Sequence, residues 1–292
     1  MLLLFAALVF SPNLHHGGSD PIPQADKGLI KTLRNMKDNT ETLEELTEQD
    51  HGLVEGDIVL QSDRNAVDRK WTTLDIPYVI SPGLAARTND IVAALEMISE
   101  STCLSFHQRT TEHDYIFFRS SKGCASYVGV IGGKQDLHVG RFCKVGNIVH
   151  EVLHALGFYH EHTRPDRKNY ITIVSENIMK GRERNFQMQI GKTFQLPYDL
   201  LSIMHYGSNY FSANGRPTIK SKVKEGRMGQ RIKMSPTDIQ RVRLLYKCDS
   251  TRSQNKTGEA EQTAGGVSWR ALVENWRTAP APARDVSLGA VA

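Results

Sequence analysis

The chain has 292 residues, of which 39% are hydrophobic and 23% charged, and its formal net charge is +4. This composition excludes a disordered or fibrous chain and accommodates one large or two modest domains around a buried core. The charge is unevenly distributed: residues 1–64 contain 5 basic and 11 acidic residues, whereas residues 65–292 contain 31 and 21. An acidic leader on a basic body would help to hold an inhibitory segment, or the basic body would favour acidic substrates. Ordinary solvated charge explains the asymmetry equally well.

The N-terminus has the pattern of a secretory signal peptide. Residues 1–10 are almost wholly apolar and are followed by Ser11 and Pro12. This run is too short to span a bilayer and fits the apolar part of a signal, which we place at residues 1–19. No later run of about 18 apolar residues follows, so we expect a secreted protein without a membrane span.

Residues 20–64 are polar and acidic and form the next unit, with a weakly amphipathic helical stretch over 28–46. In the apolar run 53–60, Glu-Gly-Asp would place a carboxylate on a tight turn, because Gly56 allows close approach to another surface. The polar segment 62–65 contains a basic residue and would suit a trypsin-like processing protease. An ordinary turn and an ordinary linker are the competing interpretations.

From Trp71 the composition is that of a folded domain, which we place at residues 65–248. Apolar runs and helical spacing there predict strands at 76–80, 115–118, 125–130 and 135–139, an ordered segment at 171–174, and helices around 91–98, 145–156 and 235–246, the last capped by Ser235 or Asp238. Residues 249–292 are rich in small and polar residues, and we expect a mostly disordered tail with Asn255 as a candidate glycosylation site.

One stretch within this domain carries metal chemistry. His150 and His154 are four residues apart, so on a helix both imidazoles leave the same face. Gly157 would let the chain turn so that His160 becomes a third ligand. Three protein ligands leave a zinc ion open to water, and Glu151 would then act as the general base. The alternative is a chance His-Glu-x-x-His pattern on an ordinary amphipathic helix, which Gly157 and His160 at their offsets disfavour.

Two residues farther along belong to the same hypothesis. Met204 would form a soft floor under the three imidazoles, or would be an ordinary core methionine. Tyr206 would reach the zinc or a substrate oxyanion, or would be an ordinary half-buried tyrosine. The residues alone leave both alternatives open.

The four cysteines allow three pairings, and an even count suits an oxidised, secreted protein. None of them has Cys-x-x-Cys spacing, so a cysteine zinc site is disfavoured. No phosphate loop or base-stacking aromatic pattern is present, and we therefore expect no nucleic-acid partner.

Between Leu53 and Cys248 the chain resembles the astacin family of secreted zinc endopeptidases. The resemblance rests on the motifs HEVLHALGFYHEHTRPDR (150–167), SIMHYG (202–207), GGKQ (132–135), GQR (229–231) and VEGDI (54–58). It implies an α+β metzincin fold of two lobes, with an active-site cleft between an N-terminal mixed-sheet lobe and an irregular C-terminal lobe. It also implies one zinc ion held by His150, His154 and His160, with Glu151 as general base and Tyr206 as a resting zinc ligand that moves to stabilise the oxyanion.

The resemblance also implies a latch in the leader. Asp57 would occupy the water position on zinc, although Val54 replaces the Phe that is usual in this motif. Cleavage after Arg64 would free Asn65, whose ammonium would become buried near Glu161.

Further implications concern the disulfides and the substrate pocket. The resemblance implies the pairs Cys103–Cys248 and Cys124–Cys143, and it makes Arg231 a candidate for favouring acidic side chains just after the scissile bond. Lys168 stands where an acidic residue is usual.

The pattern is nearest to that of the hatching-enzyme-like members. It lacks the two extra cysteines that such relatives often carry near the mature N-terminus, and no growth-factor-like, CUB or membrane-anchor module is recognisable after Cys248. We therefore predict a secreted, monomeric zinc endopeptidase, made as a zymogen and activated by a trypsin-like protease, that hydrolyses extracellular or egg-coat-type proteins. The alternative is a catalytically idle protein that keeps this fold to bind a matrix or egg-coat glycoprotein.

Overall fold

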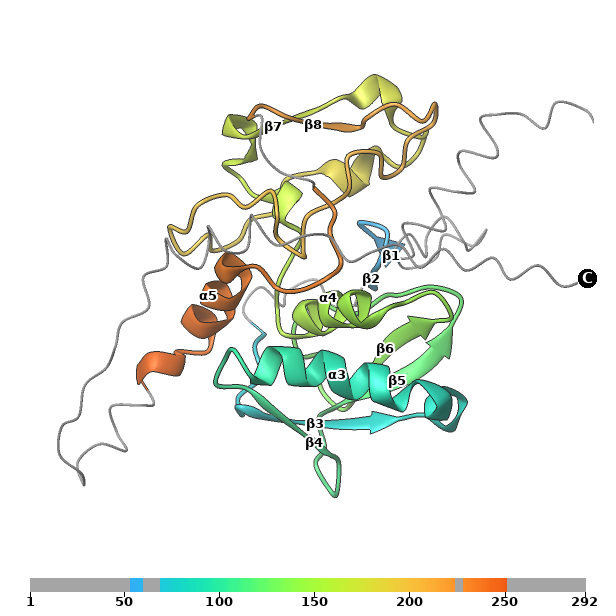
Figure 1. The fold of residues 1–292 in the computed structure, drawn as a ribbon, viewed down its shortest axis with the longest axis vertical. Coiled ribbons are helices and arrows are strands. Elements are labelled where there is room, and N and C mark those ends of the chain that lie inside the picture. The colour runs from blue at the N-terminus through green and yellow to red at the C-terminus, as the bar shows by residue number, and fades with distance from the viewer. Residues whose placement is uncertain (1–52, 60–68, 224–227, 251–292) are drawn as a thin grey trace, which may run out of the picture.

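A computed structural model describes residues 53–59, 69–223 and 228–250 (Figure 1). The strands are β1 (Leu53–Val54), β2 (Ile58–Val59), β3 (Asp75–Ile80), β4 (Ser105–Gln108), β5 (Tyr115–Ser121), β6 (Lys134–Gly140), β7 (Ile171–Ile173) and β8 (Ile219–Ser221). The helices are α3 (Thr88–Ser99), α4 (Val145–Ala155) and α5 (Pro236–Leu245), with short 3-10 turns η1 (Pro82–Arg87), η2 (Glu161–Thr163), η3 (Arg167–Asn169), η4 (Ser175–Asn177) and η5 (Glu183–Phe186). No helix among these residues is long and apolar enough to span a membrane.

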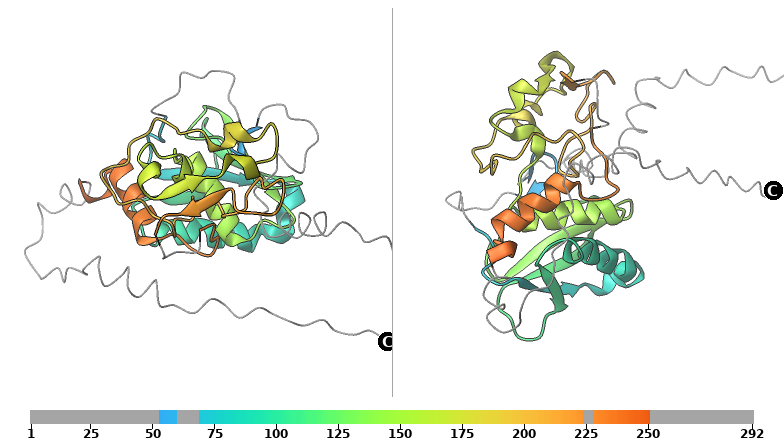
Figure 2. Two further views of the ribbon diagram at one scale, coloured as in Figure 1. Left: turned by 90° about the horizontal axis from the view of Figure 1, so that it is seen from above. Right: turned by 60° about the vertical axis from the view of Figure 1, so that its left-hand side comes forward.

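The first lobe, which we call the sheet lobe, is built on a four-stranded sheet of order β4-β3-β5-β6. All its strand pairs are parallel, and helices α3 and α4 pack with it around one hydrophobic core. Parallel strands buried in this way read as apolar runs in the sequence, which is why β3 and β5 were predictable. The apolar side chains of β6 are Leu137 and Val139, and this strand was predicted from the glycine pair 132–133 that turns into it. Helix α5 adds Val242 and Tyr246 to the same core and lies beside this lobe in Figure 1 and in the right-hand view of Figure 2.

The predicted strand at 125–130 is wrong, because only two of its residues form isolated bridges. Ala125 bridges antiparallel to His138, and Ser126 bridges parallel to Ile58 of the leader. Gly129 has a φ of +74° and bends the backbone, with its N–H donating to the carbonyl of His154. The mixed character expected of this sheet is therefore confined to one antiparallel bridge.

The second lobe, residues 161–223, which we call the turn lobe, is irregular. Its regular structure is the antiparallel pair β7–β8 and several 3-10 turns. Its separate core is rich in aromatic residues, namely Phe186, Tyr198, Tyr206, Tyr210 and Phe211, with aliphatic neighbours such as Ile171 and Ile219. Shape in this lobe depends on side-chain packing and hydrogen bonds more than on repeated backbone structure.

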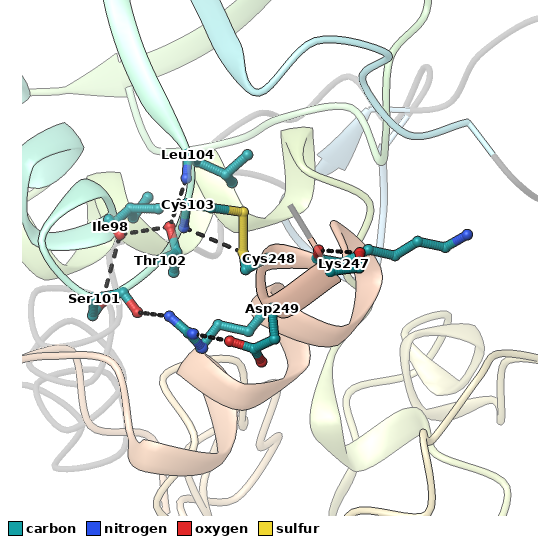
Figure 3. The surroundings of a disulfide bond; sticks show 10 residues. Ile98, Ser101, Thr102, Cys103, Leu104, Lys247, Cys248 and Asp249 are labelled. Carbon is teal, nitrogen blue, oxygen red and sulfur yellow. Dashed lines mark hydrogen bonds and ion pairs between the residues drawn. A yellow bond between two sulfur atoms is a disulfide. The ribbon is translucent and has the colours of Figure 1, made fainter. Parts of the chain in front are cut away.

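A disulfide joins Cys103 to Cys248 and ties the end of α5 to the connection between α3 and β4 (Figure 3). In the same connection, the hydroxyl of Thr102 donates to the carbonyl of Ile98 and accepts from the N–H of Leu104. A second disulfide joins Cys124 to Cys143. These are the two pairs that the resemblance implied, and the described residues contain no free cysteine.

The leader segment 53–59 lies between the two lobes as the small antiparallel pair β1–β2 (Figure 1). Toward the sheet lobe, Val59 donates its N–H to the carbonyl of Ser126, at 2.8 Å. Toward the turn lobe, the N–H of Glu55 donates to the side-chain oxygen of Asn185, at 3.0 Å. The leader therefore contacts both lobes at the level where α4 carries its histidines.

Candidate metal centre and active site

Helix α4 presents His150 and His154 on one face, as their spacing predicted. Their Nε2 atoms lie 3.1 Å apart. Gly157 has a φ of +107°, so the helix ends in a conformation that favours glycine and the chain turns back. This turn brings Nε2 of His160 to 3.2 Å from that of His150 and to 3.3 Å from that of His154. Three imidazole nitrogens therefore converge on one point.

The other ring nitrogen of each histidine is held by an oxygen atom. Nδ1 of His150 donates to the carbonyl of Ile203 at 2.8 Å, and Nδ1 of His154 donates to that of Phe158 at 2.6 Å. Nδ1 of His160 lies 2.7 Å from Oε2 of Glu55. With Nδ1 as donor, each neutral imidazole would present the lone pair of Nε2 to the centre, which is the tautomer that a metal ligand needs.

Burial and nearby carboxylates set the protonation of this cluster. Burial lowers the pKa of His150 to about 3 and that of His154 well below its usual value, so both rings are neutral. Burial also opposes protonation of His160, but Asp57 and Glu55 outweigh it and raise the pKa of His160 to about 9. The negative charge that attracts a proton here also attracts a metal cation.

The fourth group at the centre is Asp57 of the leader, which is 1% exposed. Its Oδ2 lies 3.2 Å from Nε2 of His150, and its Oδ1 lies 3.3 Å from Nε2 of His160. One ligand atom from each of Asp57, His150, His154 and His160 falls within 4.8 Å of every other. Three imidazoles and one carboxylate are a donor set that suits zinc, so the residues present fit that ion.

Glu151, the predicted base, lies on α4 next to His150 and is completely buried. A carboxylate buried at this position, away from bulk water, is suited to exchange a proton with a group at the metal centre. Its role in catalysis stays a prediction.

The turn that contains Met204 is hydrogen-bonded to His150 and is anchored from α5. Asp238 accepts hydrogen bonds from the hydroxyl of Ser202, at 2.6 Å, and from the N–H of Ile203, at 2.9 Å. The carbonyl of Ile203 in turn accepts from His150. Met204 is 2% exposed and belongs to the core of the sheet lobe. The sequence indicated Asp238 only as a possible helix cap, and it missed this anchoring.

Tyr206 is buried in the aromatic core of the turn lobe. Its hydroxyl donates a short hydrogen bond to the backbone carbonyl of Glu55, and its ring stacks on His162 at a centroid distance of 3.8 Å. In this structure the phenol is therefore bound to the leader.

Glu55 is the leader residue that sequence reasoning missed. Its carboxylate accepts from Nε2 of Gln189 at 2.6 Å as well as contacting His160, and its backbone binds Asn185 and Tyr206. The backbone of Glu55 has a φ of +51°, an uncommon conformation for a residue other than glycine. An acidic residue directly before a Gly-Asp turn was the one signal available.

Glu161 is buried between two cationic side chains. Arg241 contacts both carboxylate oxygens, at 2.7 and 2.5 Å, and Arg164 contacts one of them at 3.3 Å. The N–H of Asp199 also donates to it, at 2.8 Å. Glu161 and Arg241 line a cavity of about 340 Å³.

The remaining predicted site residues lie elsewhere. Arg231 is half-buried and donates to the carbonyls of His205 and Gln230. Arg64, Asn65 and Asn255 lie outside the described residues, as do the predicted signal peptide and residues 251–292 of the predicted tail.

Comparisons with known proteins agree with this geometry. Blastula protease 10 of Paracentrotus lividus is 42% identical over 195 residues, which are 62% of this chain and 33% of that protein. Zinc metalloproteinase nas-4 of Caenorhabditis elegans is 38% identical over 224 residues, 69% of this chain and 71% of that protein. The chain thus spans about a third of the length of the first relative.

A solved structure is also similar: high choriolytic enzyme 1, a hatching enzyme zinc-protease from Oryzias latipes. It matches with a TM-score of 0.59 at 38% identity and covers 65% of this chain and 98% of its own. The model of the peptidase family "Astacin" matches residues 63–247, well over half of the chain. From the extent of this match, together with a metal centre built from the motif residues, we conclude that the chain belongs to the astacin family.

Proposed function

We propose that this protein is a secreted, zinc-dependent endopeptidase that is made as a zymogen. The observation that carries the proposal is the position of the Asp57 carboxylate among the three Nε2 atoms. A carboxylate supplied by a leader at this point occupies the position that a catalytic centre leaves open to water. Removal of the leader would open that position.

The chemistry follows from the residues around the centre. Zinc held by His150, His154 and His160 would polarise a peptide carbonyl and lower the pKa of water to about 7. Glu151 would accept a proton from the attacking water and deliver it to the departing nitrogen. Tyr206, released from the carbonyl of Glu55, would donate a hydrogen bond from its hydroxyl to the oxyanion. The products are a carboxylate and an amine.

Activation would proceed by cleavage after Arg64 by a trypsin-like protease. The new ammonium of Asn65 would then enter the cavity beside Glu161. The supporting observations are the buried carboxylate and the volume of about 340 Å³ next to it. Glu161 would keep its arginine partners, so the ammonium would join an existing ion-pair network instead of creating one.

We further propose that the enzyme acts outside the cell, as a monomer, on extracellular or egg-coat-type proteins. The apolar N-terminus and the two disulfides support secretion, because disulfides persist in oxidising compartments. The similarity to a hatching enzyme supports the substrate class. Arg231 is the candidate for a preference for acidic side chains after the scissile bond.

The proposal is tested by measuring hydrolysis of fluorogenic peptides by the full chain, before and after limited trypsin treatment. Activity that appears only after cleavage, and disappears with Glu151→Gln or a zinc chelator, is expected. N-terminal sequencing of the active form should begin at Asn65. If the cleaved, zinc-loaded protein hydrolyses no member of a broad peptide library, the endopeptidase proposal fails and the idle binding protein becomes the better interpretation.

A further inference from the structure

The further inference concerns His162, a buried histidine for which the proposed reaction has no use so far. Its ring stacks on that of Tyr206, with centroids 3.8 Å apart and an interplanar angle of 27°. The other ring neighbours of Tyr206 meet it at larger distances or angles: His160 at 4.6 Å and 62°, and Tyr210 at 4.8 Å and 39°. The closest and most nearly parallel ring beside the phenol is therefore that of His162.

The plane of this imidazole is anchored. Nε2 of His162 lies 2.9 Å from the backbone carbonyl of Asn185, which can only accept, so Nε2 carries the hydrogen. Phe186 packs against the ring edge-on, with centroids 5.8 Å apart. The side chain is completely buried, so it cannot tilt without displacing this packing.

The need to fill space in the core does not by itself explain why residue 162 is a histidine. Nδ1 of His162 is buried, and no hydrogen-bond partner reaches it among the described residues. A buried polar atom without a partner costs free energy, and a hydrocarbon side chain of similar volume would avoid that cost. What the imidazole supplies is a flat ring that one hydrogen bond holds in a fixed plane.

Removal of the leader would change the surroundings of Tyr206 mainly at its hydroxyl group. The acceptor of its hydroxyl is the carbonyl of Glu55, which belongs to the leader. The backbone contact between Glu55 and Asn185 is lost with it. The stack on His162 lies within the turn lobe and stays. Offset stacking is one of the arrangements that aromatic rings favour, so a shift of the phenol parallel to the His162 ring keeps the contact between them.

We propose that His162 is a positioning residue for Tyr206. Its ring is the surface along which the phenol moves toward the metal centre when the leader departs, and it then holds the hydroxyl in line with the substrate oxyanion. The adjacent ring of His160, 4.6 Å away, marks the side on which the metal centre lies. The inference rests on the proposed endopeptidase function, because it concerns a step of that reaction.

Three substitutions separate the stack from the hydrogen bond. His162→Ala removes both, His162→Gln keeps a side-chain amide donor for the carbonyl of Asn185, and His162→Phe keeps a flat ring. In trypsin-activated, zinc-loaded enzyme we expect His162→Ala and His162→Gln to lower kcat roughly threefold to tenfold, the range that an aromatic pair can supply. KM should stay within about twofold, and His162→Phe should recover only part of kcat, because it keeps the flat ring but loses the hydrogen bond that fixes the plane of the ring.

A double-mutant cycle tests whether the effect acts through the phenol. Once Tyr206→Phe has removed the hydroxyl, adding His162→Ala should cause no further loss of kcat. A purely structural role would lower kcat by the same factor in both backgrounds. Equal losses in the two backgrounds would overturn the proposal.

A second readout does not depend on activity. In protein labelled with ¹³C-tyrosine, the Tyr206 ring signal is assigned from Tyr206→Phe, and its ring-flip rate is measured in the uncleaved full chain. Flipping should become faster in His162→Ala and His162→Gln but not in His162→Phe. Unchanged flipping would overturn the proposal even if the alanine variant proved too unstable for kinetics. A Glu151→Gln control that stayed fully active would instead contradict the proposed function.

Discussion

The sheet lobe and the turn lobe contribute to the same metal centre in different ways. In the sheet lobe, helix α4 delivers His150, His154 and Glu151 by the regular turn of a helix packed on a parallel sheet. In the turn lobe, Tyr206 and the turn at Met204 are held by single long-range hydrogen bonds and by an aromatic cluster. The comparison teaches that the ligand geometry is local in sequence, whereas the geometry around it is assembled from distant segments.

The largest expected effect tests the histidine ligands, whose geometry is local in sequence. His154→Ala removes one of three imidazoles and should reduce zinc affinity more than about 100-fold, because loss of a residue that only supports a ligand already costs roughly 10–100-fold. Zinc content after dialysis measures it. His113→Ala is the matched control, since His113 is an exposed histidine outside the cluster. Full zinc retention by His154→Ala would refute the ligand assignment.

The next largest effect tests the long-range hydrogen bonds that hold the turn at Met204. Asp238 accepts hydrogen bonds from Ser202, Ile203 and Ser235, so Asp238→Ala leaves buried donors without an acceptor. We expect the free energy of unfolding to fall by about 2–4 kcal/mol. Asp238→Asn keeps one acceptor oxygen and should cost less, and Asp249→Ala at an exposed position should cost under about 0.5 kcal/mol. If Asp238→Ala and the wild type had equal free energies of unfolding in urea titrations, this anchoring would be contradicted.

Substitutions in the leader test the two lobes together, because the leader contacts both of them. Asp57→Ala should raise the activity of the uncleaved protein on the order of tenfold. The substitution removes the carboxylate that blocks the metal centre, and with it one interaction of a charged group. Glu55→Gln should raise it less, because the amide still provides one oxygen for His160 or Gln189. After cleavage and removal of the leader, both variants should match the wild type. Unchanged latency in Asp57→Ala would argue against the latch.

The smallest effect concerns pH and the junction between the lobes. Burial and the nearby Asp238 raise the pKa of Asp199 to about 6, from 3.8. Since the folded state binds the proton more tightly, the stability that Asp199 contributes is complete below about pH 4 and is lost as the pH rises through about 6. Asp199→Asn should remove this loss, which is about 1 kcal/mol between pH 5 and 7.

Asp166 provides a control of opposite sign for that experiment. The Arg164 guanidinium lowers its pKa, so its contribution is present above about pH 4 and is lost as the pH falls. Urea denaturation of Asp199→Asn, Asp166→Asn and the wild type from pH 2 to 7 measures both, because the contribution of Asp166 is lost only below about pH 4. Parallel pH profiles for the Asp199 variant and the wild type would contradict the raised pKa.

Much of the fold was predictable because its signals are local. The apolar runs of β3 and β5, the glycine pair before β6, the helical spacing in α3 and the Ser235 cap of α5 each depend on a few adjacent residues. The segment 125–130 has the same composition but pairs through only two residues. One of these pairs with the leader, and no local pattern indicates such a partner.

The sequence by itself determined the core of the metal centre: the spacing of His150 and His154, and the glycine that returns the chain to His160. These depend on helix periodicity and on the conformational freedom of glycine, which act over a few residues. The place of Asp57 at this centre was implied only by the family resemblance. Only the tertiary structure decided that Glu55 holds His160 and Tyr206, that Asp238 anchors the turn at Met204, and that His162 lies flat against Tyr206. The contacts of Glu55 and Asp238 join residues 35 or more apart, and the stack on Tyr206 spans a comparable separation. They exist only because two differently built cores pack against each other, and no periodicity in the chain records that packing.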